Sequence, residues 1–399
     1  MKLLIYIEYF YPHIGGVERV FFEVGRRLAS KGSEVTILTT DEGDTDKYVK
    51  KRKVLFGGLV KEYKIEGMRV VKLLVPRLFK RYLFPIVSLP FAFVISRKAD
   101  LIHSANNYTV ALPCFILAKI LGKPVTVSVW EIWDKSWYIY FKPYLAVFYW
   151  LYEIIVLNLP FDFFFSPSTF IHNKLKNIPN KEKIYLAGRN LKYDIKARKI
   201  LRRKFNTVNK FVYLYYGRLG ISKGAEILIK AIADIAEEFN NICLIIFSPD
   251  YKDKKIGKII QSVNSSKRGG KASGSSGELI KLYSEIPESE LASYLSIADS
   301  IVIPDLSASF GITALEASQM GIPVISTTAG ALPEVVYGKV NFTRPGDSRG
   351  LAVAMKKAYK GEFNKVPKKN FSWDRTAEKY EKVFLKIINY NKQAGKNRL

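Results

Sequence analysis

The sequence predicts an α/β protein with two Rossmann-like domains, each built on a doubly wound parallel sheet, that face a central cleft. Three observations indicate this fold class. The chain has 399 residues, which suits two domains of about 150–200 residues better than a single core. Apolar runs of strand length alternate with helix-like stretches, which is typical of parallel sheets covered by helices on both faces. The alternation lapses around residues 187–209 and then restarts.

The first domain is expected over residues 1–190. Its first strand is predicted over Lys2–Glu8, and Val17–Lys31 carries apolar residues at the spacing of a helix. The remaining strands, each a short apolar run, are predicted over Glu34–Thr40, Asp100–Ser104, Pro124–Val129, Phe161–Ser166 and Lys183–Leu186.

The second domain is expected over residues 205–372, after a mainly basic and weakly apolar join near residues 190–208. Ser265–Gly277 is rich in Gly, Ser and Lys and is expected to form an exposed loop. An amphipathic helix from about Asp374 ends the chain. The strands are predicted over Phe211–Tyr216, Cys243–Phe247, Leu279–Ile286, Ile301–Ile303 and Pro323–Ser326, and the helices over Ala225–Phe239, Glu288–Ala298 and a segment after Gly311.

The composition excludes several classes of protein. With 48% hydrophobic and 25% charged residues, the chain is neither disordered nor a fibrous repeat. Its two cysteines, Cys114 and Cys243, lie far apart, so a disulfide scaffold is excluded and a reducing compartment is expected. The first residues have the pattern of a strand and not of a secretion signal. We therefore expect a cytoplasmic protein.

The charge is unusual. Lys and Arg number 63 against 36 Asp and Glu, which gives a net charge of +27. Such an excess favours polyanionic partners, namely nucleic acid, an anionic membrane or phosphorylated substrates. No nucleic-acid recognition motif occurs, so specific nucleic-acid binding is not expected. The basic residues gather between Lys47 and Arg81, where twelve of them accompany two acidic residues.

The stretch directly after this basic run carries no charge. Tyr82–Ser96 is fifteen residues long, which is shorter than the ~18–20 residues that span a bilayer. Pro85 and Pro90 would also break a helix there. We predict an interfacial or buried segment and no transmembrane helix.

Three predicted strand ends carry residues suited to a phosphorylated ligand. The first strand is followed by Gly15 and Gly16, and the helix after them offers free amides to an anion. Taken alone, such a glycine pair is more often only a tight strand-to-helix turn without any function. Neither a dinucleotide fingerprint nor a Walker loop occurs in the chain.

The other two strand ends lie in the second domain. Arg218 follows one strand and Lys223 precedes the next helix, so a guanidinium and an ammonium are expected to converge on a diphosphate. In the third cluster, backbone amides near Ile312–Leu315 are placed to hold phosphate. Glu316 lies on an otherwise apolar helix and needs a hydrogen-bonding partner there, for which a ribose diol is suited.

Together and in this order, these clusters resemble a retaining glycosyltransferase of family 4 with the GT-B fold. The resemblance covers almost the whole chain. It rests on the Gly-Gly loop with Glu18-Arg19, on Gly-Arg-Leu with Lys-Gly around residues 217–224, on Pro-x-x-Glu-Leu…Tyr-Leu…Ala-Asp from Pro287 to Asp299, and on Phe-Gly-x-x-x-Leu-Glu-Ala from Phe310.

The resemblance implies roles for individual residues. Arg218 and Lys223 would act in catalysis by binding the diphosphate of a UDP or GDP sugar, and Glu316 would bind its ribose. Gly15 and Gly16 would lie beside the donor's phosphate and the acceptor. The other donor-binding positions are Phe310, Gly311, Ile312 and Thr313.

The resemblance also implies that no metal and no cofactor beyond the sugar nucleotide is needed. The three histidines, His13, His103 and His172, form no ligand cluster in the sequence. The final helix, residues 373–399, would cross back to pack on the first domain.

Two departures from the family pattern stand out. The pattern has two glutamates eight positions apart, and counting back from Glu316 gives Ala308. The missing carboxylate would contact the donor sugar, so we expect nucleotide affinity to persist and the transfer rate to fall. The alanine is either natural or an experimenter's change. Many relatives also carry a histidine where Trp130 stands, and an indole accepts no proton. Glu131 is a substitute, although a structural role fits it equally well.

The acceptor is the least determined part. The candidates on its side are His13, His103, Trp130 and Glu131. The basic run and the aromatic stretch 137–152 favour a lipid-linked acceptor at an anionic membrane, on its cytoplasmic face. Aromatic residues at helical spacing also occur in ordinary cores. The alternatives are transfer to a soluble sugar or sugar phosphate, and a nucleotide-sugar-binding protein without transfer activity.

Overall fold

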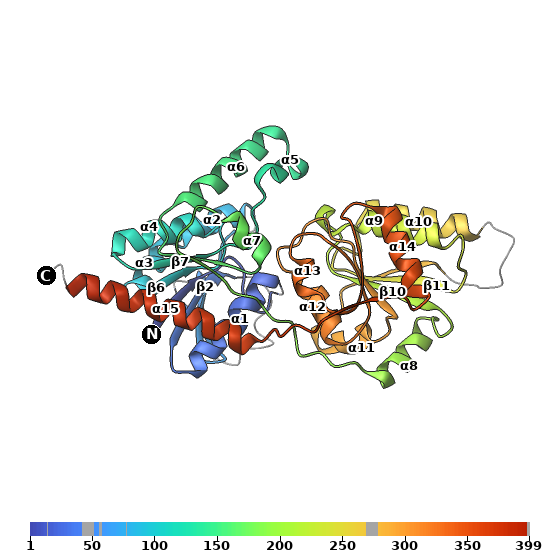
Figure 1. The fold of residues 1–399 in the computed structure, drawn as a ribbon. Coiled ribbons are helices and arrows are strands. Elements are labelled where there is room, and N and C mark those ends of the chain that lie inside the picture. The colour runs from blue at the N-terminus through green and yellow to red at the C-terminus, as the bar shows by residue number, and fades with distance from the viewer. Residues whose placement is uncertain (14, 42–51, 56–57, 77, 269–277, 397–399) are drawn as a thin grey trace. The chain divides into compact units, whose positions relative to one another are not determined.

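The chain forms two compact units, shown in a computed structural model that describes residues 1–13, 15–41, 52–55, 58–76, 78–268 and 278–396 (Figure 1). Unit 1 comprises Met1–Leu186 and Phe371–Leu399, and unit 2 comprises Ala187–Asn370. Each unit has its own largely parallel sheet with helices packed against it. The predicted α/β class with two parallel-sheet domains is therefore confirmed.

The described residues of unit 1 form a nine-stranded sheet of order β3-β4-β5-β2-β1-β6-β7-β8-β9. All neighbours from β5 to β9 pair in parallel, whereas β3 with β4 and β4 with β5 pair antiparallel. The strands are β1 (Lys2–Tyr6), β2 (Glu34–Thr40), β3 (Arg52–Leu55), β4 (Val60–Ile65), β5 (Met68–Leu73), β6 (Leu101–Ser104), β7 (Val125–Ser128), β8 (Phe163–Ser166) and β9 (Lys181–Lys183).

Helix α1 (Gly16–Ser30) is the predicted first helix, shifted by one residue at each end. Its apolar residues at helical spacing, Val20, Phe21, Val24 and Leu28, are all fully buried. Their burial fixes the helix on the sheet. The loop before it therefore stays at the carboxyl end of β1, where ligands of parallel sheets bind.

The uncharged stretch 82–96 forms two short helices. Pro90 stands in the first turn of the second one, where a missing amide is tolerated, while Pro85 lies inside the first. None of the described helices is long and apolar enough to cross a membrane. The helices of unit 1 after α1 are α2 (Lys80–Val87), α3 (Leu89–Ser96), α4 (Ala111–Leu121), α5 (Trp137–Tyr140), α6 (Pro143–Asn158) and α7 (Thr169–Lys174).

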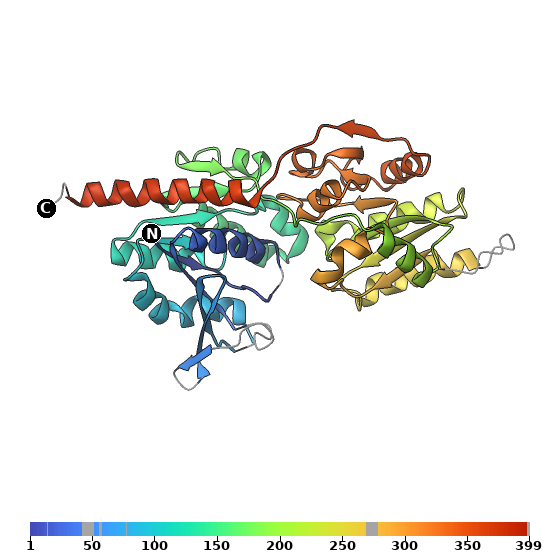
Figure 2. The same ribbon diagram turned by 90° about the horizontal axis from the view of Figure 1, so that it is seen from below.

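The last helix, α15 (Trp373–Lys396), packs on unit 1 beside α1, and Figure 2 shows it running along that unit. Arg27 of α1 donates to Asp374 at 2.6 Å, and Lys31 pairs with Glu381 at 2.8 Å. Tyr380, deeper in the contact, lies against Phe165 of β8 with 4.5 Å between ring centroids. Apolar packing and ion pairs at the rim together hold the end of the chain on the first sheet.

Unit 2 has a seven-stranded sheet in its described residues, of order β12-β11-β10-β13-β14-β15-β16, and only β15 with β16 pair antiparallel. Its strands are β10 (Phe211–Tyr216), β11 (Ile242–Phe247), β12 (Ile280–Tyr283), β13 (Ser300–Ile303), β14 (Val324–Thr327), β15 (Gly338–Thr343) and β16 (Asn364–Val366). Its helices are α8 (Ile195–Lys204), α9 (Ala225–Ile235), α10 (Lys254–Arg268), α11 (Leu291–Leu295), α12 (Ile312–Gln319), α13 (Leu332–Val335) and α14 (Ser348–Tyr359).

Two predicted elements were placed wrongly. The strand expected over Lys183–Leu186 is β9, which ends at Lys183 because the chain leaves the sheet edge there, although Ile184 and Leu186 remain buried. The loop expected from Ser265 begins later, since residues up to Arg268 continue α10. The rest of that predicted loop, 269–277, lies outside the described residues.

Two regions for which the sequence predicted no helix or strand contain regular elements. Strands β4 and β5 lie within the basic run, where Val60 and Tyr63 point inward and charged residues alternate with them. In the join between the domains, Asp194 caps α8 by accepting from the Ala197 amide at 2.9 Å. Charged residues interrupt the apolar pattern in all three of these elements, which the sequence therefore did not indicate.

Candidate functional site

The sheet of unit 2 changes winding direction between β10 and β13. The chain runs from β10 to β11 on one side and reaches β13 on the other side later. Ligands of open parallel sheets bind at the carboxyl ends of the strands beside such a switch point. Arg218 and Lys223 follow β10, while Asp305 and Ala308 follow β13. The structure thus gathers two of the predicted clusters at one sheet edge.

Lys223 contacts the end of the neighbouring strand. Its Nζ lies 2.5 Å from Asp305 Oδ2. Asp305 is buried, and burial raises the pKa of its carboxyl even though the ammonium of Lys223 acts in the opposite direction. Gly224, the next residue, has a φ of +64°, and a Cβ there would lie 2.0 Å from the Pro304 carbonyl oxygen. The glycine therefore lets the two strand ends approach closely enough for the ion pair.

Arg218 is exposed, and its guanidinium has no hydrogen bond or ion pair with any of the residues that the structure describes. Its backbone is held, because Tyr215 donates its hydroxyl to the Arg218 carbonyl. An arginine that binds phosphate needs a fixed backbone and a guanidinium that is available for two parallel hydrogen bonds.

Glu316 of α12 is 1% exposed. The Tyr216 hydroxyl donates to its Oε2 at 2.9 Å, and the Arg189 amide donates to its Oε1 at 3.2 Å. The Arg189 guanidinium lies 3.4 Å from the same carboxylate. Burial, with the adjacent carboxylate, raises the pKa of Tyr216 well above its usual value, so this phenol stays protonated and donates. The partner that the sequence required for Glu316 is thus supplied by the protein itself.

The turn before α12 is tightly packed. Phe310 is buried, and Gly311 has a φ of +95° with Leu332 close to where a Cβ would lie. No side chain caps the helix, so the amides of Ile312 and Thr313, both half-buried, keep free donors at its N-terminus.

Ala308 lies in the same turn and is buried. Its carbonyl oxygen accepts from the Ala331 amide at 2.9 Å. A Cβ on Gly330, whose φ is +53°, would lie 2.1 Å from that oxygen. The backbone of residue 308 is therefore fixed by the turn at Gly330–Ala331, independently of its side chain.

In unit 1, Gly15 is the N-cap of α1. A Cβ at Gly15 would lie 2.0 Å from the Glu18 carboxylate, which folds back over the start of the helix. Glu18 Oε1 lies 3.3 Å from His13 Nδ1, and the His13 ring stacks on Tyr9. A glycine at position 15 is thus needed for a close approach, but the group that approaches it here is a carboxylate of the chain.

His103 was predicted as a candidate on the acceptor side, but the structure places it in the core of unit 1. It is fully buried on β6, with Nδ1 2.8 Å from Thr126 Oγ1 and Nε2 3.1 Å from Ser128 Oγ. Burial lowers the pKa of His103 to about 3. The aromatic rings of Phe21 and Phe384 pack around it. No ring nitrogen is left for a ligand.

Trp130 and Glu131 follow β7 at the predicted place. The Trp130 indole is mostly buried and donates to the Ala105 carbonyl at 2.6 Å. The Glu131 carbonyl accepts from Asn107 and from the Tyr108 hydroxyl, at 3.0 and 2.7 Å. Both residues therefore help to join the loops after β6 and β7.

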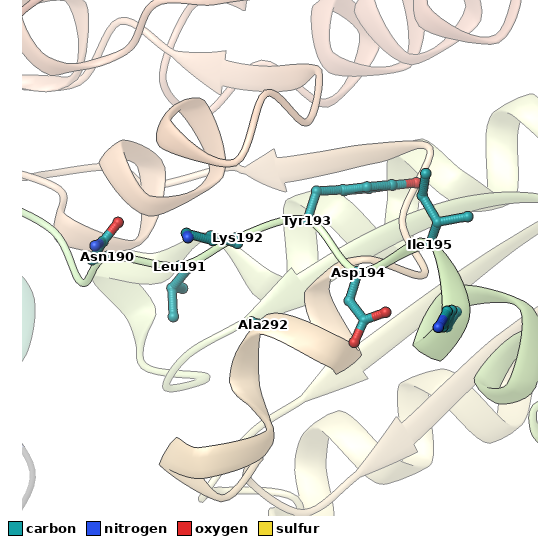
Figure 3. A pocket seen from close by; sticks show the side chains of 8 residues that line it. Asn190, Leu191, Lys192, Tyr193, Asp194, Ile195 and Ala292 are labelled. Atoms are coloured by element: carbon teal, nitrogen blue, oxygen red, sulfur yellow. The ribbon is translucent and has the colours of Figure 1, made fainter.

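A pocket of about 560 Å³ lies elsewhere in unit 2, between the segment before α8 and helix α11 (Figure 3). It contains none of the predicted site residues. Its lining is Asn190, Leu191, Lys192, Tyr193, Asp194, Ile195, Lys196 and Ala292. We assign it no role, because the chemistry-bearing groups gather at the strand ends. Among the described residues, no three His, Cys, Asp or Glu side chains are grouped as a metal site would require.

Known families account for both halves of the chain. Residues 14–188 match the model of glycosyltransferase family 4, and residues 197–380 match that of glycosyl transferases group 1. Each half of the chain thus matches a glycosyltransferase model, and the fold is that of the GT-B glycosyltransferases. HepE of Anabaena, solved in complex with UDP and glucose, has the same fold, with a TM-score of 0.68 at 15% identity over 100% of this chain and 99% of that one.

Curated relatives support the family. An uncharacterised glycosyltransferase of Methanocaldococcus jannaschii is 24% identical over 97% of this GT-B chain and 99% of its own length. A D-inositol 3-phosphate glycosyltransferase of Pseudarthrobacter chlorophenolicus is 27% identical over 42% of this chain and 40% of its own length. For five of the curated relatives, including the P. chlorophenolicus enzyme, the match spans only 31% to 43% of the relative's own length.

Sequence reasoning missed the residues that hold this GT-B site together. Tyr216 and Arg189 bind Glu316, and Asp305 binds Lys223. Two of them carried a usable signal, because Tyr216 ends β10 and Asp305 follows β13 within two residues. Polar residues at the carboxyl ends of adjacent parallel strands meet at the same sheet edge. Arg189 lay in the join and gave no such signal.

Proposed function

We propose that this protein is a retaining, metal-independent glycosyltransferase that moves a hexose from a UDP or GDP sugar to an acceptor. The observation that carries the proposal is the group of cationic side chains and uncapped backbone amides near the switch point of unit 2. Arg218 and Lys223 supply positive charge, and the uncapped start of α12 supplies amides. Together they would balance the leaving diphosphate without a bound cation.

Glu316 is proposed to bind the ribose. Its carboxylate has two oxygens, and each can accept more than one hydrogen bond. The bonds from Tyr216 and Arg189 orient it and leave capacity for a diol.

Ala308 is proposed to impair transfer. The backbone of residue 308 is held by the turn at Gly330–Ala331, so a glutamate there would start from the same backbone position. Without that carboxylate the donor sugar loses one contact, whereas the diphosphate loses none. A nucleotide-sugar-binding protein without transfer activity is the corresponding alternative.

Calorimetric titration of this chain and of its Ala308→Glu variant with UDP, GDP and their hexose sugars tests the donor site. We expect both proteins to bind one nucleotide selectively and only the variant to turn over rapidly. Binding by both proteins with turnover by neither would favour the non-transferring alternative. Failure of both to bind any nucleotide would exclude the glycosyltransferase function.

The acceptor is proposed to be lipid-linked, because helix α6 buries its one carboxyl side chain and exposes its apolar side chains to solvent. The one carboxyl side chain of this helix, Glu153, is buried and accepts from the Tyr108 hydroxyl, the Trp133 and Asp134 amides and the Trp137 indole. The side exposed to solvent is apolar apart from Asn158, the last residue of the helix. Its large apolar residues are Tyr144, Leu145, Val147, Phe148, Leu151, Ile154 and Ile155.

This apolar face continues onto neighbouring helices. Tyr82 of α2 and Tyr149 of α6 share a hydrogen bond between their hydroxyls, which joins the two helices. Ile86 of α2 and Val94 of α3 are also exposed. A contiguous apolar surface of this kind marks a contact with a partner or a membrane.

Basic residues at its edge favour an anionic bilayer. Arg81 precedes Tyr82 and is 62% exposed, and Lys142 is exposed directly before α6. Figure 1 shows α6 projecting from the rest of unit 1, where it can enter a headgroup layer. Apolar side chains inserted between headgroups, with lysine and arginine at the rim, bind an anionic surface. We therefore propose a peripheral location on the cytoplasmic membrane face.

Sedimentation with vesicles of phosphatidylglycerol and phosphatidylcholine tests this surface. Phe148→Glu combined with Leu151→Glu is expected to lower the bound fraction tenfold or more and to leave nucleotide affinity unchanged. The matched control is Ile200→Glu with Val353→Glu, which changes two exposed apolar residues of unit 2. Equal vesicle binding by both pairs would exclude α6 as the membrane contact.

One relative favours a second acceptor class. The P. chlorophenolicus relative is named a D-inositol 3-phosphate glycosyltransferase. D-inositol 3-phosphate is a soluble polyol phosphate. If the wild-type chain fails to sediment with anionic vesicles at physiological salt, transfer to a soluble sugar or sugar phosphate becomes the better proposal.

A further inference from the structure

The sheet of unit 1 has a switch point of its own. From β1 the chain first adds β2 on one side and later adds β6 on the other. Glu8 follows β1 and Thr109 follows β6, so the two residues flank this point. By the same rule that locates the donor site in unit 2, a ligand of unit 1 binds here.

Glu8 is held firmly by its backbone. Its carbonyl oxygen accepts from the hydroxyls of Thr39 and Thr40 at 3.0 and 2.7 Å, and from the Thr40 amide at 3.1 Å. The residue itself is 4% exposed. Its position at the strand end is therefore set by β2 and not by contacts of the carboxylate.

The carboxylate of Glu8 is only half satisfied. Oε2 accepts from Thr109 Oγ1 at 2.9 Å, and Arg81 Nε lies 3.4 Å from the same oxygen. Oε1 is buried and has no hydrogen-bond partner among the residues described by the structure. A buried carboxylate oxygen without a donor destabilises a fold, so its presence needs a reason.

The other buried carboxylates of unit 1 differ from Glu8. Glu153 has four donors. Glu23 is bound by the guanidinium groups of Arg26 and Arg27 on its own helix. Among these three buried carboxylates, the one that has an oxygen without a donor is therefore the one at the switch point, where a ligand is expected.

We propose that Glu8 binds a hydroxyl group of the acceptor. Oε1 lacks a donor, and a carboxylate oxygen accepts hydrogen bonds, so the group that completes it is a hydrogen-bond donor. Arg81 already stands beside it, and a ligand ammonium would be repelled by that guanidinium, whereas a neutral hydroxyl would not. The inference rests on the proposed function and adds to it the group that recognises the acceptor as a polyol.

A ligand would reach the Glu8 carboxylate by displacing the Arg81 side chain. Since Arg81 is largely exposed and approaches only to 3.4 Å, it is the neighbour that can move away at least cost. It also lies on α2, which carries part of the apolar face. A lipid-linked acceptor held at that face would present its hydroxylated headgroup beside the same helix.

Binding of three polyol probes, glycerol, myo-inositol and n-octyl β-D-glucoside, tests the proposal by titration followed with NMR. We expect at least one probe to bind the wild-type chain, and Glu8→Gln and Glu8→Leu to weaken it at least fivefold. Glu23→Gln is the matched control, because it alters a buried carboxylate of the same unit away from the switch point. UDP and GDP affinities, measured on the same samples, are expected to be unchanged in all variants.

The outcomes separate the two proposals. If no probe binds the wild-type chain, or if both Glu8 variants bind as tightly as the wild type, the role of Glu8 is excluded. If nucleotides fail to bind the wild type as well, the proposed function fails independently. Should the Glu8 variants be more stable to urea than the wild type and still bind the probes normally, the orphaned oxygen is a structural defect and the proposal falls.

Discussion

Lys223 and Asp305 form an ion pair across the switch point of the second sheet, with 2.5 Å between Nζ and Oδ2. Lys223 lies after β10 and Asp305 after β13, so two strand ends are joined. Asp305 is buried, while the side chain of Lys223 is 38% exposed. The ammonium offered to a diphosphate is therefore partly neutralised by the protein before any ligand arrives.

Asp305→Asn should strengthen nucleoside-diphosphate binding. The amide keeps a hydrogen-bond acceptor for Lys223 but removes a negative charge that competes with the ligand. Removing one charge at this range is worth about 1 kcal/mol in a solvated site, which corresponds to roughly fivefold in affinity. Calorimetry at low and high salt measures the effect, which should shrink with salt. A weaker complex would instead mean that Asp305 positions Lys223 and does not compete for it.

Arg218→Ala and Lys223→Ala should each weaken nucleotide binding by roughly 1.5–3 kcal/mol, as expected for lost hydrogen bonds to a charged group. Their effects on stability should differ. Arg218 is exposed, whereas Lys223→Ala leaves the buried Asp305 carboxylate without its cation. Calorimetry and urea unfolding measure the two effects, with Lys230→Ala, on exposed α9 surface, as control. Unchanged affinity in both variants would contradict the site assignment.

The free energy of unfolding should fall as the pH drops from 6.5 toward 5. Burial lowers the pKa of His103 to about 3, while an unfolded histidine titrates near pKa ~6.5. Between these values the unfolded chain binds a proton that the folded chain does not, so stability decreases with falling pH. The contribution of His103 is about 2 kcal/mol between pH 6.5 and 5.

Urea unfolding at pH 7 and pH 5 measures this dependence. His103→Gln should reduce it by about that amount of 2 kcal/mol, since no proton uptake remains at the position. His172→Gln, which removes a half-buried histidine, should keep most of it. An unaltered pH dependence in His103→Gln would show that the folded state also binds the proton.

Glu153→Leu should lower the free energy of unfolding by roughly 2–4 kcal/mol. The substitution removes the acceptor for the Trp133 and Asp134 amides, the Trp137 indole and the Tyr108 hydroxyl, and leaves buried donors unsatisfied. Glu226→Leu is the control, because its partner Lys255 is exposed and such pairs contribute ~0–1 kcal/mol. Equal losses would mean that α6 is not anchored through Glu153.

Much of the fold was predictable from apolar periodicity. The buried positions of α1 and the central strands β1, β2, β10 and β11 follow patterns that are apolar enough to recognise. The antiparallel strands β4 and β5 were missed, because β4 buries only one side of a charged segment and β5, although largely buried, carries Arg69 and Lys72. Their inward residues, such as Tyr63, become recognisable only once the partner strand is known.

The candidate site was predictable only in part. Arg218 and Lys223 were proposed as donor-site residues because glycines and strand ends mark where a chain turns toward a ligand. Asp305 and Tyr216 were missed as partners, since they meet Lys223 and Glu316 across 82 and 100 residues of sequence. His103 was a wrong candidate, because nothing in the local sequence distinguishes a ligand-facing histidine from one packed inside β6.

The sequence alone therefore determined the class of fold, the family and the cationic strand ends of the second unit, because these depend on local pattern and on motifs that lie close together in the chain. The tertiary structure decided which charges remain available. Burial and long-range hydrogen bonds satisfy Glu316 and Glu153, neutralise part of Lys223 and leave one oxygen of Glu8 without a donor. Such differences arise from the desolvation of polar groups, which depends on the neighbours that the folded chain brings together.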